Sequence, residues 1–405
     1  MASPILLIKV AGGDKPGLMA MLTSTLCEYQ VALLDVGQAI VHDQLALGYL
    51  VQAERADVAA LSRAVENIGA EVGSAIEITE VAEQRYTEWV ASTGQPRYIL
   101  TLLSAGRLAA ALNAVSTITR RHGLNIDTVR RLSDRVPLSQ LAEPHSSFVE
   151  IRVRGAVFDA ATVQADLLEA AARDGFDFSM QEDNVYRRNR RVVAFDMDST
   201  LIDAEVIDEL AKIHGVGEEV ARVTERAMQG ELDFKESFRA RVKLLNGLSE
   251  NAFEQVARSV QLNAGAERLF SVLRHFGYKT AVISGGFQYV GERLRKRLGI
   301  DYVFANDLVV AEGRITGEVR GEIVDAQRKA EHLRGIAELE RIDLQQTIAI
   351  GDGANDLPML SAAGLGVAYH AKPLVRESAS HAISNFGLDA VLYLMGFSDF
   401  DLRAI

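Results

Sequence analysis

Apolar and polar positions follow two different periods in the first part of the chain. Ile5–Val10 is a short apolar run that predicts a strand, and the spacing of apolar residues over 16–29 predicts a helix. The same signals predict strands at about 33–41 and 45–53, a helix at about 56–70 and a strand at about 74–81. The resulting order, β-α-β-β-α-β, is typical of a ferredoxin-like α/β sandwich.

This order of elements recurs once. The second set comprises a strand at about 98–103, a helix at 107–121, strands near 124–132 and 146–154, a helix at about 160–174 and a strand at 176–180. Val31–Leu34 corresponds to Leu124–Asp127 at an offset of 93 residues. Two copies indicate a duplication rather than a solenoid, which needs more repeats. Residues 83–96 are the expected joint between the copies, and 181–191 the expected linker, with its arginines on a solvated face.

From residue 192 onward, short apolar runs are separated by longer helical segments. Strands are predicted at about 192–195, 278–283, 301–305, 347–350, 365–368 and 381–384. Segment 206–245 shows only helical periodicity and is predicted to be a small insertion above the strand ends. The alternation of strands and helices indicates a Rossmann-like parallel sheet. Ligands bind such sheets beyond the carboxyl ends of the strands.

Polar side chains follow three of these strands. Asp196 and Asp198 lie two residues apart and project to the same side, where one can be an ionised nucleophile and the other a proton donor. Ser284–Gly286 offers a hydroxyl and free amides at a helix start, which suit a phosphate. Gly351–Asp356 offers carboxylates that suit a hard cation. Taken singly, each segment has an ordinary structural explanation, such as an Asx turn or a loop.

Together, the order and spacing of these segments resemble the haloacid dehalogenase superfamily of phosphohydrolases. The resemblance is carried by Asp196-x-Asp198-Ser-Thr, Ser284-Gly-Gly, Lys329 and Gly351-Asp352-Gly-x-Asn355-Asp356. A closer similarity, to the phosphoserine phosphatase family, is carried by Asp196–Glu205, Met228–Phe234, Arg239–Val242 and Gly351–Met359. Met197 stands where the family more often has phenylalanine, a change that leaves the carboxylates intact.

The resemblance implies Mg²⁺-dependent hydrolysis of O-phospho-L-serine to L-serine and phosphate through an aspartyl phosphate, as the last step of phosphorylated serine biosynthesis. Asp196 would be the nucleophile and Asp198 the general acid and base, while Ser284 and Lys329 neutralise the phosphoryl oxygens. The implied metal ligands are Asp196, the backbone carbonyl of Asp198, and Asp352. Substrate contacts are implied for Glu205 (ammonium), Arg241 (carboxylate), Met228, Phe234, Ser284, Gly285, Lys329, Asn355 and Asp356.

The first turn of the chain, Gly12–Gly17, points to regulation. Asp14 is expected to cap the following helix and Pro16 to occupy its first position. This turn within this order of elements resembles the ACT domain, a regulatory amino-acid-binding module. The resemblance implies a homodimer or higher homo-oligomer. It also implies an amino-acid effector held by Asp14 and Gly17 of the first β-α-β-β-α-β copy and by Asn125 of a second copy. The second copy lacks the Asp-x-Pro-Gly sequence and has Ala110 where the first has Gly17.

Composition sets outer limits on these expectations. The formal net charge of −12 over 405 residues argues against a nucleic-acid partner, and no apolar run reaches membrane-spanning length. The single cysteine, Cys27, excludes an intrachain disulfide, is consistent with a cytoplasmic location and is expected to be buried in its helix. We expect domains at 1–90, 91–183 and 184–405, with a helical cap at about 205–262.

Two alternatives remain open from the sequence. One is a phosphatase of the same superfamily that acts on another phosphomonoester or on a phosphoprotein. The other is an amino-acid-sensing module whose catalytic half is degenerate. Glu205 and Arg241 favour a zwitterionic amino-acid ester over the first, and the presence of every catalytic position argues against the second.

Overall fold

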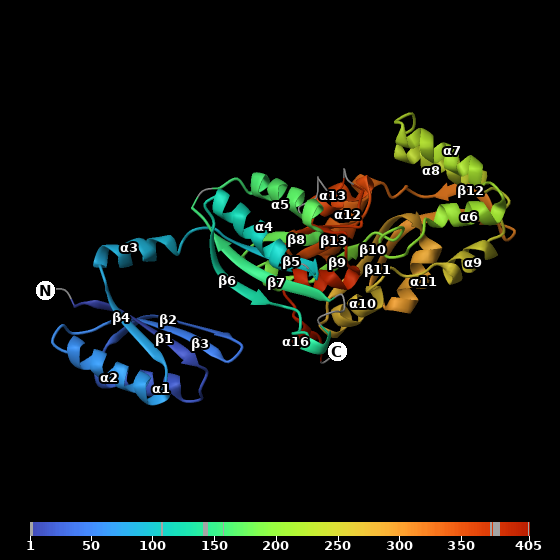
Figure 1. Cartoon of the computed structure of the whole chain (residues 1–405). Coiled ribbons are helices and arrows are strands. Elements are labelled where there is room, and N and C mark those ends of the chain that lie inside the picture. Colours follow the sequence, from blue (N-terminus) through green and yellow to red (C-terminus); the bar gives the residue numbers. More distant parts are fainter. Residues whose placement is uncertain are drawn as a thin grey trace. The chain divides into compact units, whose positions relative to one another are not determined.

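The chain divides into two compact units. The computed structural model describes residues 3–106, 108–140, 145–156, 158–372, 375, 381–403 and 405. Unit 1 comprises Met1–Gln95 and unit 2 comprises Pro96–Ile405. Figure 1 shows the elements of each unit. Among the described helices, none combines the length and apolar character needed to cross a membrane.

Unit 1 has the predicted β-α-β-β-α-β order around a four-stranded antiparallel sheet, β2-β3-β1-β4. Alternate residues of β1, such as Ile8 and Val10, are buried beneath α1 and α2 with Leu22 and Leu61. The elements are β1 (Ile5–Gly13), α1 (Leu18–Glu28), β2 (Ala32–Val41), β3 (Gln44–Gln52), α2 (Val58–Val72) and β4 (Ala75–Val81), followed by α3 (Glu83–Ser92) in the expected joint.

Two expectations for unit 1 are wrong. Helix α1 begins at Leu18 because Gly17 takes a left-handed conformation (φ 92°) at the N-cap, so Asp14 does not cap the helix and Pro16 lies outside it. Cys27 is exposed rather than buried, because its neighbour Leu26 occupies the inward-facing position on that turn.

Unit 2 begins with the second β-α-β-β-α-β set. A β-bulge interrupts β6 between Ile126 and Thr128, and an equivalent bulge interrupts β2 between Leu33 and Asp35, 93 residues earlier. The two copies therefore share a local irregularity at the offset that the sequence predicts. The elements are β5 (Arg97–Ala105), α4 (Leu108–Arg121), β6 (Asn125–Arg131), β7 (Ser146–Arg154), α5 (Ala160–Asp174) and β8 (Phe176–Glu182).

The remainder of unit 2 is the Rossmann-like part with its helical insertion. Its strands are β9 (Val192–Phe195), β10 (Lys279–Phe287), β11 (Tyr302–Ala311), β12 (Arg314–Arg320), β13 (Thr347–Gly351), β14 (Leu365–Tyr369) and β15 (His381–Ile383). Its helices are α6 (Val206–His214), α7 (Gly217–Met228), α8 (Phe234–Leu244), α9 (Asn251–Ser259), α10 (Ala266–His275), α11 (Gln288–Leu298), α12 (Ala326–Leu339), α13 (Leu357–Ala362), α15 (Val391–Leu394) and α16 (Asp399–Leu402). Short 3₁₀ turns lie at Leu138–Gln140, Arg187–Asn189, Leu344–Gln346, Ala354–Asp356 and Leu388–Ala390.

One continuous sheet of eleven strands runs through unit 2, in the order β12-β11-β10-β9-β13-β14-β15-β8-β5-β7-β6. Helices cover both faces of its centre, with α12 on one face and α10 and α11 on the other (Figure 1). Val192 and Ala194 pack with α12 residues, while Val193 and Phe195 pack with α10 and α11. This two-sided burial explains the uninterrupted apolar run of β9.

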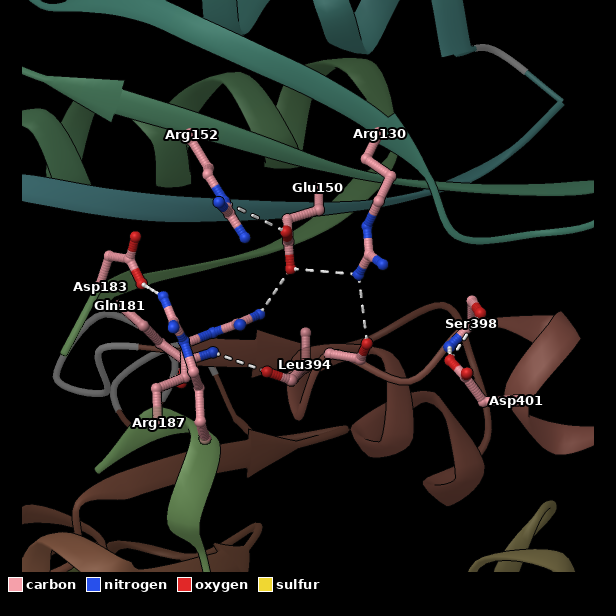
Figure 2. Close-up of polar contacts among 11 residues, drawn as sticks. Arg130, Glu150, Arg152, Gln181, Asp183, Arg187, Leu394, Ser398 and Asp401 are labelled. Carbon is pink, nitrogen blue, oxygen red and sulfur yellow. Dashed lines mark hydrogen bonds and ion pairs between the residues drawn. The ribbon is translucent and has the colours of Figure 1, made fainter. Parts of the chain in front are cut away.

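The second β-α-β-β-α-β set joins this sheet through antiparallel pairing of β15 with β8. Beside the junction, the Arg187 guanidinium donates to the buried Glu150 carboxylate at 2.9 Å (Figure 2). Arg190 donates to the carbonyls of Gln345 and Gly364. Arg187 and Arg190 are each only 6% exposed, so the expectation of a solvated arginine face is wrong for these two. Their burial is compensated in part by hydrogen bonds to these carboxylate and carbonyl oxygens.

Candidate functional site

The candidate site forms where three neighbouring parallel strands end. Strand β9 lies between β10 and β13, so their carboxyl ends meet at one edge of the sheet. Asp196 follows β9, Ser284 lies near the end of β10 and Asp352 follows β13. The topology thus brings together residues that are up to 156 positions apart in the sequence.

A buried lysine connects two of the carboxylates. The Lys329 ammonium, from the first turn of α12, lies 2.8 Å from Asp196 Oδ1 and 2.7 Å from Asp356 Oδ1. Burial alone would lower the pKa of Lys329, but the charges of Asp196 and Asp356 outweigh it and raise the pKa. Lys329 is therefore a buried cation in direct contact with Asp196 and Asp356 at the floor of the site.

Asp198 lies in a contrasting environment. Its Oδ1 is buried and has no hydrogen-bond partner among the described residues. Burial raises the pKa of Asp198 well above its usual range, and the nearby charges of Glu205 and Asp196 add to the effect. A Cβ at Gly286 would lie 2.8 Å from Asp198 Oδ2, so glycine at 286 leaves room for this carboxyl group. Asp198, whose raised pKa suits a proton donor, therefore lies near Asp196, which contacts the Lys329 ammonium. A proton donor near a nucleophilic oxygen is the arrangement needed for acid-assisted attack.

Three carboxylates lie close enough to share one metal ion. Oxygen atoms of Asp196, Asp352 and Asp356 all lie within 4.8 Å of one another. Burial raises the pKa of Asp352 to about 6, Asp196 adds to this, and the Thr200 hydroxyl, donating at 2.8 Å, opposes it. Crowded, partly desolvated carboxylate oxygens are the donor set that suits a hard divalent cation. The residues present are therefore compatible with a divalent metal.

Two glycines shape the loop after β13. A Cβ at Gly351 would lie 2.4 Å from the Asp356 carboxyl carbon, and a Cβ at Gly353 would lie 2.1 Å from Asn355 Oδ1. The Gly353 amide donates to Asp356 at 3.0 Å. Glycine at 351 and 353 thus allows Asp356 and Asn355 to fold back toward the strand end.

The cap contributes charged and aromatic groups. Burial raises the pKa of Glu205, which accepts a hydrogen bond from Ser199 at 2.9 Å. Arg241 on α8 has a buried Nε without a described partner, and its pKa is lowered by burial. The Phe234 ring lies 3.0 Å from the position of a Cβ at Gly285 and so covers the Ser284 loop. Met228 is 72% exposed and contributes no such cover.

Four further residues were assigned no role from the sequence. Ser199 and Thr200 belong to the Asp-x-Asp-Ser-Thr segment and donate to Glu205 and Asp352. Asn263 donates to backbone carbonyls of that segment, and Lys235 forms an ion pair with Asp325 at 2.8 Å. The hydroxyls of Ser199 and Thr200 were detectable from their position in the motif. Asn263 and Lys235 lie in ordinary polar surroundings that give no sequence signal.

The expected regulatory residues lie on separate units. Asp14 and Gly17 are exposed in unit 1. Asn125, at the start of β6 in unit 2, donates to Asp127 at 2.7 Å. Their joint role in binding an effector stays a prediction.

Comparison with known proteins agrees with this geometry. Residues 193–361 match the haloacid dehalogenase-like hydrolase family, and residues 4–79 match the ACT domain. A phosphoserine phosphatase of Streptomyces coelicolor is 39% identical over 99% of this chain and 94% of its own length. The chain belongs to the phosphoserine phosphatase family. Phosphoserine phosphatase SerB2 of Mycobacterium tuberculosis is 37% identical over 98% of this chain and 94% of its own length.

Two related solved structures share the architecture. A haloacid dehalogenase family hydrolase from Salmonella enterica serovar Typhi superposes with a TM-score of 0.64 and 29% identity over 74% of this chain and 98% of its own. A probable phosphoserine phosphatase from Vibrio cholerae superposes with a TM-score of 0.58 and 33% sequence identity, over 78% of this chain and 90% of its own. The mixed α/β fold, with a small ACT sheet before a mostly parallel sheet, is therefore confirmed.

Proposed function

We propose that the protein hydrolyses O-phospho-L-serine to L-serine and inorganic phosphate, the last step of phosphorylated serine biosynthesis. The observation that carries this proposal is the contrast between Asp196, which contacts the Lys329 ammonium at 2.8 Å, and Asp198, whose pKa is raised by burial. The full-length similarity to phosphoserine phosphatases supports the choice of substrate.

The reaction would proceed in two displacements. An Asp196 oxygen attacks phosphorus, the bond to the serine oxygen breaks, and Asp198 gives its proton to that oxygen. Asp198, now ionised, takes a proton from a water molecule that attacks the aspartyl phosphate and releases phosphate. Each step transfers one phosphoryl group and one proton, and Asp196 and Asp198 return to their starting states.

The surrounding groups stabilise the charge on the phosphoryl oxygens. Lys329 and the Ser284 hydroxyl face this group and neutralise its charge as it transfers. Asp196, the Asp198 backbone carbonyl and Asp352 would hold Mg²⁺, with Asp356 completing the acidic cluster and orienting Lys329. Bound Mg²⁺ would screen the approach of an anionic ester to these carboxylates.

The cap would recognise the serine portion of the substrate. Glu205 has the sign required for an ammonium group, and the free Nε side of Arg241 suits a carboxylate. Phe234 would exclude water from the Ser284 loop, with Gly285 beneath its ring. Asn355 would contact the phosphate or the attacking water. The expected contact from Met228 requires a movement of the cap, because this side chain is 72% exposed here.

The test is phosphate release from O-phospho-L-serine and from a panel of other phosphomonoesters and a phosphopeptide, with and without Mg²⁺. We expect metal-dependent turnover that strongly favours phosphoserine, lost in Asp196→Asn. Equal turnover across the panel would support a broader phosphatase, and no turnover would support the sensing module.

We further propose regulation of this site by an amino acid bound to the ACT-like part of a homo-oligomer, at the turn containing Asp14 and Gly17 with Asn125 from a second-copy unit. The product serine is the natural candidate for the effector, because feedback would couple the effector site to the catalytic site and such coupling is reciprocal. An Asp14→Ala, Asn125→Ala chain that kept the wild-type response to serine would contradict this.

The domain division at 90 and 183 and the cytoplasmic location stay predictions.

A further inference from the structure

The two linkers that connect the cap to the core run beside each other. The outgoing linker is Ser199–Asp203 and the returning linker is Gln261–Asn263. Ile202 and Leu262 form an isolated antiparallel bridge. The Asp203 amide donates to the Gln261 carbonyl at 3.1 Å, and the Asn263 amide donates to the Leu201 carbonyl at 3.0 Å. Any movement of the cap must therefore pass through this paired segment, which directly follows Asp198.

The Asn263 side chain fastens the pair together. Its Nδ2 lies 2.8 Å from the Thr200 carbonyl, 3.3 Å from the Ser199 carbonyl and 3.3 Å from the Ile202 carbonyl. One amide group thus donates to three carbonyls on the outgoing linker. An apolar side chain or a carboxylate at this position has no N–H group to donate.

The outgoing linker needs this support because its backbone is strained. Ser199 has φ 58°, a left-handed conformation that residues other than glycine rarely adopt. In this conformation the Ser199 hydroxyl donates to Glu205 at 2.9 Å and the next hydroxyl, of Thr200, donates to Asp352 at 2.8 Å. The kink therefore directs two adjacent side chains to two different parts of the site.

We propose that Asn263 is a positioning residue that holds the Ser199 kink, and through it orients both the ammonium-binding carboxylate Glu205 and the metal-binding carboxylate Asp352. The Glu205 part of this proposal rests on the proposed phosphoserine specificity. The Asp352 part rests only on the carboxylate cluster. Asn263 itself touches no reacting atom and acts through the linker.

The experiment compares Asn263→Ala with Gln261→Ala in the full chain. Gln261 is the matched control, because it lies on the same linker and its side chain donates to the Ser259 carbonyl of its own segment. Two readouts are needed: kcat/KM for O-phospho-L-serine and for O-phospho-L-lactate, which lacks the ammonium, and Mg²⁺ affinity by calorimetry without substrate. Ser199→Ala, which removes only the hydrogen bond to Glu205, is the third variant.

We expect Asn263→Ala to lower kcat/KM for phosphoserine about 10- to 100-fold and to weaken Mg²⁺ binding to a similar degree, as is usual for groups that orient metal ligands. Its preference for phosphoserine over phospholactate should shrink. Ser199→Ala should lose that preference and retain Mg²⁺ affinity. Gln261→Ala should match the wild type in every readout.

The proposal is overturned if a folded Asn263→Ala protein keeps both the preference and the Mg²⁺ affinity of Gln261→Ala. If Asn263→Ala does not fold, an unchanged preference in Ser199→Ala overturns it instead. A wild-type enzyme without preference for phosphoserine would refute the proposed substrate, while the Mg²⁺ titrations would still decide the role of Asn263 toward Asp352.

Discussion

Asp196 and Asp198 lie two positions apart on one loop, yet they lie in different environments. Lys329 lies 2.8 Å from Asp196, whereas Asp198 Oδ1 has no partner among the described residues. The Lys329 ammonium can pair with a nucleophilic carboxylate, whereas burial raises the pKa of Asp198 and suits that group to donate a proton. The difference in environment, and not in residue type, separates the proposed nucleophile from the proposed acid.

Replacing Asp198 by asparagine should therefore abolish proton transfer without emptying the metal site. We expect kcat to fall about 10²- to 10⁴-fold, the usual contribution of general acid–base catalysis. Mg²⁺ affinity should change little, because only the backbone carbonyl of residue 198 is a proposed ligand. Steady-state kinetics and calorimetry would measure the two effects. Glu218→Gln, at an exposed carboxylate on α7, is the control.

A second prediction concerns His381 at the β15–β8 junction. Burial lowers its pKa to about 3, the nearby Arg190 charge adds to this, and its Nδ1 lies 3.0 Å from Ser179 Oγ. Between the usual pKa of about 6.5 and the lowered value, the unfolded chain binds a proton that the folded chain does not. The contribution of His381 to the free energy of unfolding is therefore fully present above the usual histidine pKa. It decreases by about 1.4 kcal/mol for each pH unit as the pH falls below that pKa.

Denaturant unfolding at pH 7.5, 6.0 and 5.0 would measure this slope. His381→Gln should show a shallower loss of unfolding free energy on acidification than the wild type. Parallel pH profiles for the two proteins would show that His381 does not titrate differently in the folded and unfolded chains.

At the scale of elements, helix α8 of the cap contacts the core through its first two residues. Its first residue, Phe234, covers Gly285, and the next, Lys235, lies 2.8 Å from Asp325. Asp325 is also the N-cap of α12, the helix that carries Lys329. The ion pair thus joins the cap to the helix that supplies the buried cation of the site.

Removing this contact should favour an open cap. We expect Lys235→Ala to raise KM for phosphoserine about 2- to 5-fold, the modest effect of a partly exposed ion pair, with a smaller change in kcat. The difference from the wild type should shrink at high salt, since salt screens exposed charges. Lys243→Ala, at an exposed lysine of the same helix, is the control. An equal KM shift in both variants would attribute the effect to net charge alone.

The order of elements was predictable from periodicity, because each helix and strand buries a face whose spacing the sequence records. The first turn was not, because the left-handed Gly17 decides where α1 begins and the sequence also allowed Asp14 as cap. Asp196, Ser284 and Asp352 were identifiable because they directly follow or end apolar strands. Asn263 and the buried Arg187 depend on partners from distant segments, which no local pattern encodes.

At the scale of the whole unit, a buried ion pair joins β7 of the second β-α-β-β-α-β set to the turn Arg187–Asn189, which leads into β9. Glu150 is 2% exposed and accepts from Arg187, while Arg130 and Arg152 approach it at 3.8 and 3.7 Å from the more exposed side (Figure 2). The second copy is therefore built into the enzyme body rather than tethered to it.

Breaking this pair from one side should be costly. Glu150→Gln leaves the Arg187 charge buried without its counterion, and we expect a loss of about 3 kcal/mol in the free energy of unfolding of unit 2. Glu150→Met combined with Arg187→Met should recover most of that loss, because no charge remains buried. Arg152→Ala is the control at the exposed edge of the cluster. A Glu150→Gln protein as stable as this control would contradict the prediction.

The pairing of β8 with β15 also has a consequence for biosynthesis. Ser179 leaves the ribosome 202 residues before its neighbour His381. At ordinary rates of translation this interval lasts roughly 10–40 s. During that time β8 presents an unpaired strand edge, the surface through which nascent chains associate. The growing polypeptide is thus more open to edge-to-edge association than the finished enzyme.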